Sequence, residues 1–282
     1  MKKELIKTEN NESFQPKYLK LSHFSLLIIA MIAMTINHVG TFFFHDDLSI
    51  VRTLYTIGRI AFPLYAFISV QGVYKSSNNL EYSLRLIVLG LLIDLVMFFS
   101  NHGYNGNAMF ELGLGVLALS LFKRNDGFSL LGLIPAAVMV LSDFEYFPIR
   151  AEYGTYGLAI MLGFYFGEKF GSYYIDYYAS LTKIDKDYLI KSSLRKYQNI
   201  FSIVIFIILS ILFSVLSLLY PNAFFINKLL GFQIQDYAII ASVFIFFYSG
   251  KQGIHNAFTQ GFFYLYYPLH IVLLYYLSLW LL

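Results

Sequence analysis

Five ionisable side chains stand inside stretches of sequence that are otherwise apolar enough to cross a membrane. They are His38, Arg59, Asp94, Glu111 and His270. A charge near the middle of a membrane helix costs roughly 2.5–3.5 kcal/mol on insertion scales, so such residues usually bind substrate, carry protons or pair with one another. Histidine titrates near neutral pH, so each of the two imidazole side chains can accept and release a proton.

The spacing of these residues predicts that most of them share one level of the membrane. At a helix rise of about 1.5 Å per residue, four of them fall in one layer of the outer half, and His270 lies closer to the midplane. We expect these side chains to converge in one wet pocket that faces the exterior. The simpler alternative is that Arg59 pairs with Asp94 or Glu111 and only holds helices together, but pairing does not account for two histidines.

Two prolines stand close to these ionisable residues. Pro63 cannot donate the backbone hydrogen bond to the carbonyl of Arg59, so we expect the helix to bend beside the cation. In the last apolar stretch, Pro268 similarly frees the carbonyl of Tyr264 near His270. The sequence therefore predicts irregular helices at two points of the site.

The composition shows what kind of fold must position the site. The chain has 282 residues, of which 58% are hydrophobic and 13% are charged, against about 45–50% and about 25% in soluble domains. This excludes a soluble globule and favours an integral membrane protein. The absence of cysteine excludes disulfides, thiolate metal sites and a cysteine acyl-enzyme, and we predict no metal site.

The predicted fold is all-α: a polytopic transmembrane helix bundle of about nine spans, with its N-terminus inside. The net charge of +3 is unevenly placed, because most Lys and Arg residues fall in the segments that this topology puts inside. We therefore relate the charge to membrane topology and expect no nucleic-acid binding. The expected spans are 21–44, 51–74, 84–100, 107–122, 127–142, 153–170, 199–220, 228–249 and 261–282.

Within this topology we expect a cytoplasmic polar tail over 1–20 and a single membrane domain over 21–282. The segment 171–198 is the longest inside stretch, and it interleaves tyrosines with lysines. It is predicted to be a cytoplasmic or interfacial loop, either a plain tether or a helix lying on the inner leaflet.

Several short motifs together resemble the TraX-like family of membrane proteins. They follow the family's order along most of the chain, with two departures: Asn37 stands where an aspartate is usual, and Glu111 where threonine is more common. The matching segments are 30–40 (AMIAMTINHVG), 58–63 (GRIAFP) with Phe67 and Gly72, Asn78, Tyr82 and Arg85-Leu86, 107–112 (NAMFEL), 152–154 (EYG) with Gly157, and 267–270 (YPLH).

The resemblance implies membrane acetyl transfer, because the family's namesake is associated with N-terminal acetylation of conjugative pilin. The family is also similar to the type 3 membrane acyltransferases, which move acetyl from cytoplasmic acetyl-CoA to surface sugars and share a histidine and an arginine at the positions of His38 and Arg59. The implied protein is a bacterial plasma-membrane acetyltransferase. Its acceptor would be a hydroxyl or amine at the outer face, on a surface polysaccharide or a pilin-like protein.

On this hypothesis His38 is the general base and His270 its reserve. Arg59 and Asn107 stabilise the oxyanion, while Asp94 and Glu111 hold Arg59 or orient the acceptor. Inner-face cations bind the phosphates of acetyl-CoA. Lys75 and Arg85 are the first choice for this role, and Lys123 and Arg124 are the next.

Two other functions fit the same residues. A proton-coupled permease would use the buried histidines and carboxylates, although the paired interrupted spans typical of such transporters are not visible. A non-catalytic assembly factor for pili or the cell envelope would need the polar residues only for folding.

Overall fold

A computed structural model describes residues 15–44, 46–99, 106–221 and 235–281. Secondary structure within these ranges is helical apart from an isolated parallel bridge between Leu21 and Tyr248. Most of the expected polar tail lies outside the described residues. The helices are α1 (His23–Phe43), α2 (Leu48–Gly58), α3 (Ala61–Lys75), α4 (Asn79–Phe99), α5 (Ala108–Phe122), η1 (Gly127–Gly132), α6 (Leu133–Leu141), α7 (Gly154–Thr182), α8 (Lys186–Leu219), η2 (Asp236–Ile240), α10 (Ala241–Phe246) and α11 (Ala257–Leu281).

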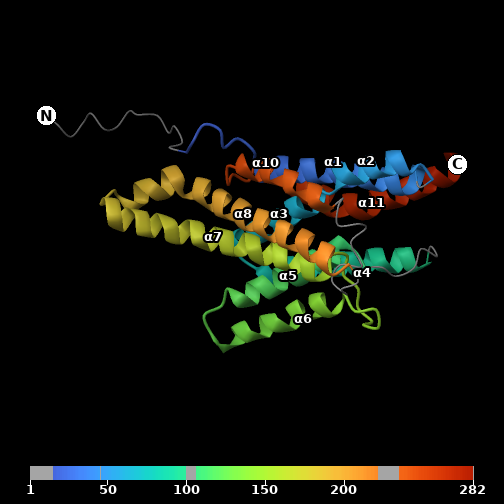
Figure 1. The fold of residues 1–282 in the computed structure, drawn as a ribbon, viewed down its shortest axis with the longest axis horizontal. Coiled ribbons are helices and arrows are strands. Elements are labelled where there is room, and N and C mark those ends of the chain that lie inside the picture. Colours follow the sequence, from blue (N-terminus) through green and yellow to red (C-terminus); the bar gives the residue numbers. More distant parts are fainter. Residues whose placement is uncertain (1–14, 45, 100–105, 222–234, 282) are drawn as a thin grey trace.

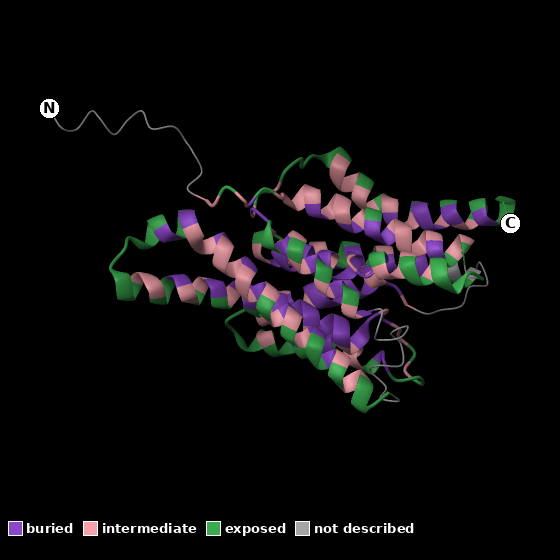
Figure 2. Cartoon of the chain, turned by 45° about the horizontal axis from the view of Figure 1, so that its top comes forward, coloured by how far each residue is buried: buried purple, intermediate pink, exposed green. Residues whose placement is uncertain are grey.

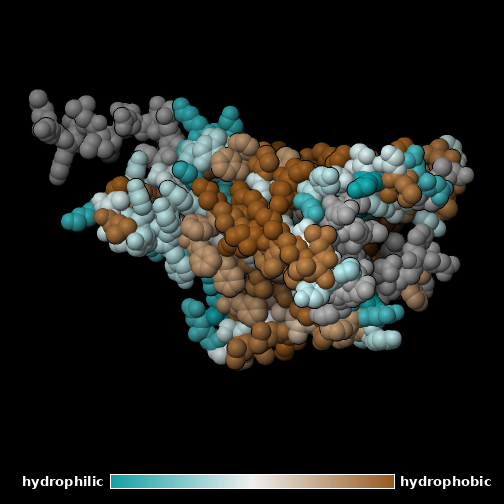
Figure 3. Space-filling view, viewed as in Figure 1, coloured by the Kyte–Doolittle hydropathy of each residue, from teal (hydrophilic) through white to brown (hydrophobic). Residues whose placement is uncertain are grey.

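The all-α prediction is confirmed for the described residues, and part of the expected span 228–249 lies outside them. Four helical stretches are long and apolar enough to cross a membrane: His23–Phe43, Leu48–Lys75, Lys186–Leu219 and Ala257–Leu281. Figure 3 shows a broad apolar surface over α8, where Val204, Ile208 and Ile211 are exposed. These features indicate a membrane protein, whereas the nine crossings and the inside N-terminus stay predictions.

Local signals in the sequence explain where several helices begin and end. The Ser22 hydroxyl accepts a hydrogen bond from the backbone N–H of Ser25 (3.1 Å) and caps α1. Asp47 caps α2 in the same way, through the backbone N–H groups of Ser49 and Ile50. The helix break between α2 and α3 falls at Arg59–Ile60, one turn before Pro63, so the predicted irregularity beside the cation is confirmed.

The inner helices α3 and α5 form the middle of the bundle. Most of their residues are buried, and Figure 2 shows the buried residues concentrated in the centre, with exposed residues at the periphery. The core includes aromatic pairs, among them Phe62 stacked on Tyr153, with ring centroids 3.8 Å apart. The site described below is built on this packed core.

The first and last helices start together at one end of the bundle and run side by side (Figure 1). Backbone hydrogen bonds join their starts through the segment after α10, from Leu21 N–H to the Phe247 carbonyl and from His23 N–H to the Lys251 carbonyl. Lys75, at the end of α3, reaches the same place and donates to the Gly250 carbonyl at 2.7 Å. Segments that the topology prediction puts inside therefore gather at one end.

The segment 171–198 is not a loop. It forms the end of a long helical hairpin, in which α7 and α8 are joined by a short turn at Lys183–Asp185, and this end projects beyond the other helices (Figure 1). Gly167 and Gly171 let the two helices touch, because a Cβ at either position would lie 2.5 Å from backbone atoms of α8. Of the two alternatives, the plain tether is wrong, because the segment is helical and its two helices pack on each other. A position on the inner leaflet stays a prediction.

A buried polar cluster fastens this hairpin to α3. The Arg195 guanidinium pairs with the Glu168 carboxylate, and it also donates to Gln71 Oε1 (2.9 Å) and Asn199 Oδ1 (2.8 Å). Gln71 donates to Glu168 Oε1 at 2.6 Å. Because the charge pair is nearly inaccessible and fully hydrogen-bonded, removing one partner would leave the other charge unpaired in the core.

We predict that Arg195→Met lowers the free energy of unfolding by about 3–5 kcal/mol, because it leaves the Glu168 carboxylate buried and unpaired. The double variant Arg195→Met/Glu168→Leu should lose less. Thermal unfolding of the detergent-solubilised protein measures both effects. Asp126→Asn, which breaks the exposed pair with Arg124, is the control and should leave the melting temperature unchanged. Equal melting temperatures for Arg195→Met and the control would contradict the prediction.

Candidate functional site

The two intramembrane histidines are hydrogen-bonded to each other. His38 Nδ1 on α1 lies 2.8 Å from His270 Nε2 on α11. The sequence placed them at different depths because it counted from the outer ends of the helices. α11 continues well past the level at which α1 ends, whereas both helices start at one level, 15 residues before His38 and 13 before His270. Counting from the shared start puts the two side chains at similar height.

The hydrogen bonds around His270 fix which nitrogens carry protons in the neutral pair. His270 Nδ1 lies 2.9 Å from the Tyr266 carbonyl, which can only accept, so this nitrogen donates. Nε2 of a neutral His270 is then an acceptor, and His38 Nδ1 must donate to it. His38 Nε2 is left with its lone pair. This tautomer is the one that a general base needs.

A small cavity of about 40 Å³ borders His38. Asn37, Glu152 and Tyr267 contribute to its wall, and the stacked rings of Phe62 and Tyr153 close another side. The loop residue Glu152 was not among the predicted site residues, although its EYG motif belongs to the family resemblance. Burial raises the pKa of the Glu152 carboxyl above its ordinary value, and the nearby Arg59 acts in the opposite direction.

Arg59 lies behind this cavity, not in its wall. Its guanidinium donates to Asn37 Oδ1 (3.1 Å) and Gln235 Oε1 (3.4 Å). The pairing of Arg59 with Asp94 or Glu111 was the simpler alternative, but within the described residues the guanidinium bonds to these two amide oxygens instead. Since the carbonyl oxygen of Asn37 is bound to Arg59, the amide group of Asn37 has its N–H donors available for the cavity.

Gly58 allows the close contact between α1 and the α2–α3 break. A Cβ at this position would overlap the Asn37 side chain and lie 2.6 Å from Asn37 Oδ1. Gly58 therefore determines how closely the Asn37 side chain can approach the α2–α3 break. This explains why a glycine precedes Arg59 in a helix that otherwise has larger residues.

The other predicted site residues have contacts that belong to the fold. Asn107 caps α5 by accepting from the Phe110 N–H, and it donates to the Gly90 carbonyl on α4 at 2.8 Å. Glu111 is fully buried and accepts from the Tyr153 N–H at 2.6 Å. Asp94 is buried on α4, with one carboxylate oxygen lacking a hydrogen-bond partner among the described residues. The structure links Glu111 to the cavity through Tyr153.

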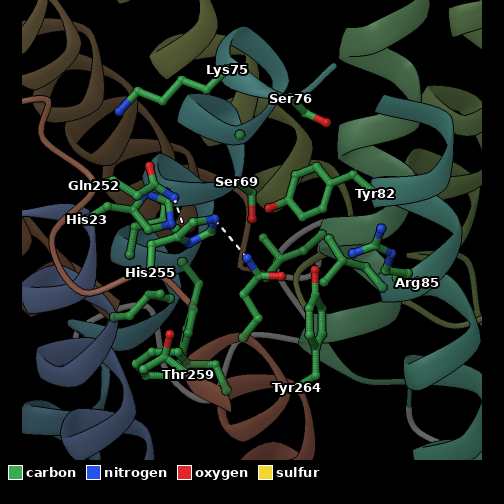
Figure 4. Close-up of a pocket in the computed structure, with 18 of the residues that line it drawn as sticks. His23, Ser69, Lys75, Ser76, Tyr82, Arg85, Gln252, His255, Thr259 and Tyr264 are labelled. Atoms are coloured by element: carbon green, nitrogen blue, oxygen red, sulfur yellow. Dashed lines mark hydrogen bonds between the residues drawn. The ribbon is translucent and has the colours of Figure 1, made fainter. Parts of the chain in front are cut away.

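A larger cavity of about 480 Å³ opens near the shared start of α1 and α11 (Figure 4). Lys75 and Arg85 are among its lining residues, with His23, His255 and Tyr264 around them. The Lys75 amine bonds to the Tyr248 hydroxyl and the Gly250 carbonyl, and Arg85 pairs with Glu81 at the exposed rim. The cavity is therefore lined by cationic side chains, hydroxyl groups and imidazoles together with apolar side chains.

Lys123 and Arg124 are not lining residues of either cavity. The Lys123 amine donates to the Val73 carbonyl (3.1 Å), and Arg124 pairs with Asp126 on the surface. The two cavities instead have three wall residues in common: Tyr65, Met109 and Leu112. The described residues contain no cluster of three or more His, Asp or Glu side chains arranged to hold a metal ion.

The fold and these cavities define a helical membrane protein with a polar site inside its bundle. The chain matches the TraX protein family over residues 22–217 and belongs to that family. It is 26% identical over 272 residues to a probable fimbrial assembly protein, FimC of serogroup H1, from Dichelobacter nodosus, which covers 90% of this chain and 94% of the relative. An uncharacterized protein of Rickettsia prowazekii (strain Madrid E) is 29% identical over 144 residues, or 49% of this chain and 53% of the relative. No solved structure gives a significant match.

We predict that Gly58→Ala destabilises the protein by about 1–3 kcal/mol, because the added methyl group overlaps Asn37 in a packed contact. Gly261→Ala is the matched control, since a Cβ there meets no atom within 4 Å. Thermal unfolding of both variants in detergent measures the difference. An unchanged melting temperature for Gly58→Ala would show that this contact is not tight.

Proposed function

We propose that this protein acts from within the membrane in the assembly or modification of pili or related cell-surface structures. Its TraX family membership and its similarity to a probable fimbrial assembly protein over nearly the full length of both chains support this role. The finer proposal concerns chemistry: the protein transfers an acetyl group from acetyl-CoA to a hydroxyl or amine. The resemblance to type 3 membrane acyltransferases is consistent with it.

The observation that carries the chemical proposal is the hydrogen-bond chain from Tyr266 through His270 to His38. It leaves a lone pair on His38 Nε2, and His38 lines the small cavity, which shares three wall residues with the larger cavity that Lys75 and Arg85 line. A base, an oxyanion donor and a site for a phosphorylated donor are the parts that acyl transfer requires. A purely structural histidine pair would not need a cavity beside it.

In the proposed mechanism, His38 Nε2 takes the proton of the acceptor as its oxygen or nitrogen attacks the thioester carbonyl. The Asn37 amide, held by Arg59, donates to the developing oxyanion. The carbon–sulfur bond then breaks, the new ester or amide remains on the acceptor, and the proton on His38 passes to the thiolate of CoA. His270 positions His38 and keeps it in the required tautomer.

The test is to supply membranes that contain the protein with acetyl-CoA labelled in the acetyl group and to identify labelled products by mass spectrometry. His38→Ala should lower kcat about 10²–10⁴-fold, the usual contribution of a general base. Ile32→Ala, an exposed position on the same helix, should transfer normally. His270→Phe should lower kcat and alter its pH dependence without changing KM for acetyl-CoA.

The same variants distinguish enzyme from assembly factor. In cells that lack the gene, His38→Ala should fail to restore the surface structure if transfer is its function. Restoration by His38→Ala, with no labelled product from the wild-type protein, would favour a non-catalytic assembly factor. Solute uptake that collapses with the proton gradient would favour the permease.

The donor site yields a separate prediction. Arg85→Gln should raise KM for acetyl-CoA about tenfold, equivalent to about 1.4 kcal/mol, because a charge-assisted hydrogen bond to phosphate is lost. Arg124→Gln is the matched control, because Arg124 is not a lining residue of either cavity, and its KM should not change. If both variants had the wild-type KM, the larger cavity would not be the donor site.

A further inference from the structure

The two cavities differ greatly in size, although they share part of their walls. The larger holds about 480 Å³ and the smaller about 40 Å³. Tyr65 on α3 and Met109 and Leu112 on α5 line both of them. These three side chains therefore lie between the larger cavity and the space beside His38.

The small cavity is bounded by tightly packed parts of the core. Phe62 is buried and stacked on Tyr153, and Gly58 and Asn37 are in close contact at another side. Leu112 is 2% exposed and Met109 is 9% exposed. Because well-packed side chains resist displacement, a longer ligand would need to overcome the cost of repacking this region.

The volume of the small cavity limits what can sit beside His38. A water-sized group needs about 10–15 Å³ of such space, so about 40 Å³ admits roughly three. An acetyl group has three non-hydrogen atoms, a propionyl group has four and a butyryl group has five. The volume of the small cavity therefore fits an acetyl group better than a propionyl or butyryl group.

We propose that Tyr65, Met109 and Leu112 form an acyl-length constriction that admits an acetyl group to His38 and rejects longer acyl groups. The inference rests on the proposed acyl transfer and adds the residues that set donor specificity. Transfer breaks the thioester carbon–sulfur bond and forms an ester or amide, whatever the acyl length. The constriction determines only which acyl-CoA can bring its thioester carbonyl to His38, and it does not change the reaction.

The experiment compares acetyl-, propionyl- and butyryl-CoA as donors with the membrane-embedded protein. In the wild-type protein, kcat/KM should fall about tenfold or more for each added methylene, since no space is available for it. Met109→Ala should raise the ratio of butyryl to acetyl transfer about tenfold. Both donors are compared on the same preparation of each variant, so a smaller amount of folded protein does not change the ratio.

Met139→Ala is the matched control, because Met139 is fully buried in a separate cluster on α6 and lines neither cavity. It should leave the donor ratio unchanged even if it destabilises the fold. Equal use of butyryl and acetyl donors by the wild-type protein would overturn the constriction while leaving acyl transfer intact. The constriction would also be overturned if Met109→Ala and Leu112→Ala both kept the wild-type ratio of butyryl to acetyl transfer. Failure of all three donors in the wild-type protein would instead refute the proposed transfer and, with it, this inference.

Discussion

Polar groups inside a helical bundle have few hydrogen-bond partners, so each must find one on another helix or on its own backbone. The hydrogen bond between His38 and His270 meets this requirement for two groups at once. It joins α1 to α11, and the hydrogen bond from His270 to the Tyr266 carbonyl fixes which nitrogen of the pair donates the proton. The direction matters because it leaves the unshared electron pair on the nitrogen of His38 that is not bonded to His270.

A second set of polar contacts holds the surrounding helices in place. Arg59 fixes Asn37 from behind the cavity, and Glu111 holds the backbone at Tyr153, where α7 begins. On the other side of the core, Arg195 and Glu168 fasten the α7–α8 hairpin to α3. The small cavity beside His38 is therefore bounded by elements that are fixed independently of one another.

The sequence predicted the helical class, most helix boundaries and the break beside Arg59, because these depend on local hydropathy and on proline. It also singled out His38 and His270, since ionisable residues are conspicuous in apolar sequence. It did not predict their direct contact, because the relative height of two helices depends on where the chain joins them. Nor did it show that Arg59 bonds to amides, or that Glu152 completes the wall, because both follow from packing between distant segments. Over 171–198 a helix was one of two alternatives, but the hairpin was not predicted, because its two helices stabilise each other and have no strongly apolar pattern.

The partner of His38 lies 232 residues further along the chain. During translation the first helix leaves the ribosome long before α11 has been made, so the imidazole of His38 must enter the membrane without its eventual hydrogen-bond partner. The pair can form only after nearly every other helix has been synthesised. Biogenesis thus keeps the site incomplete until the bundle around it is in place.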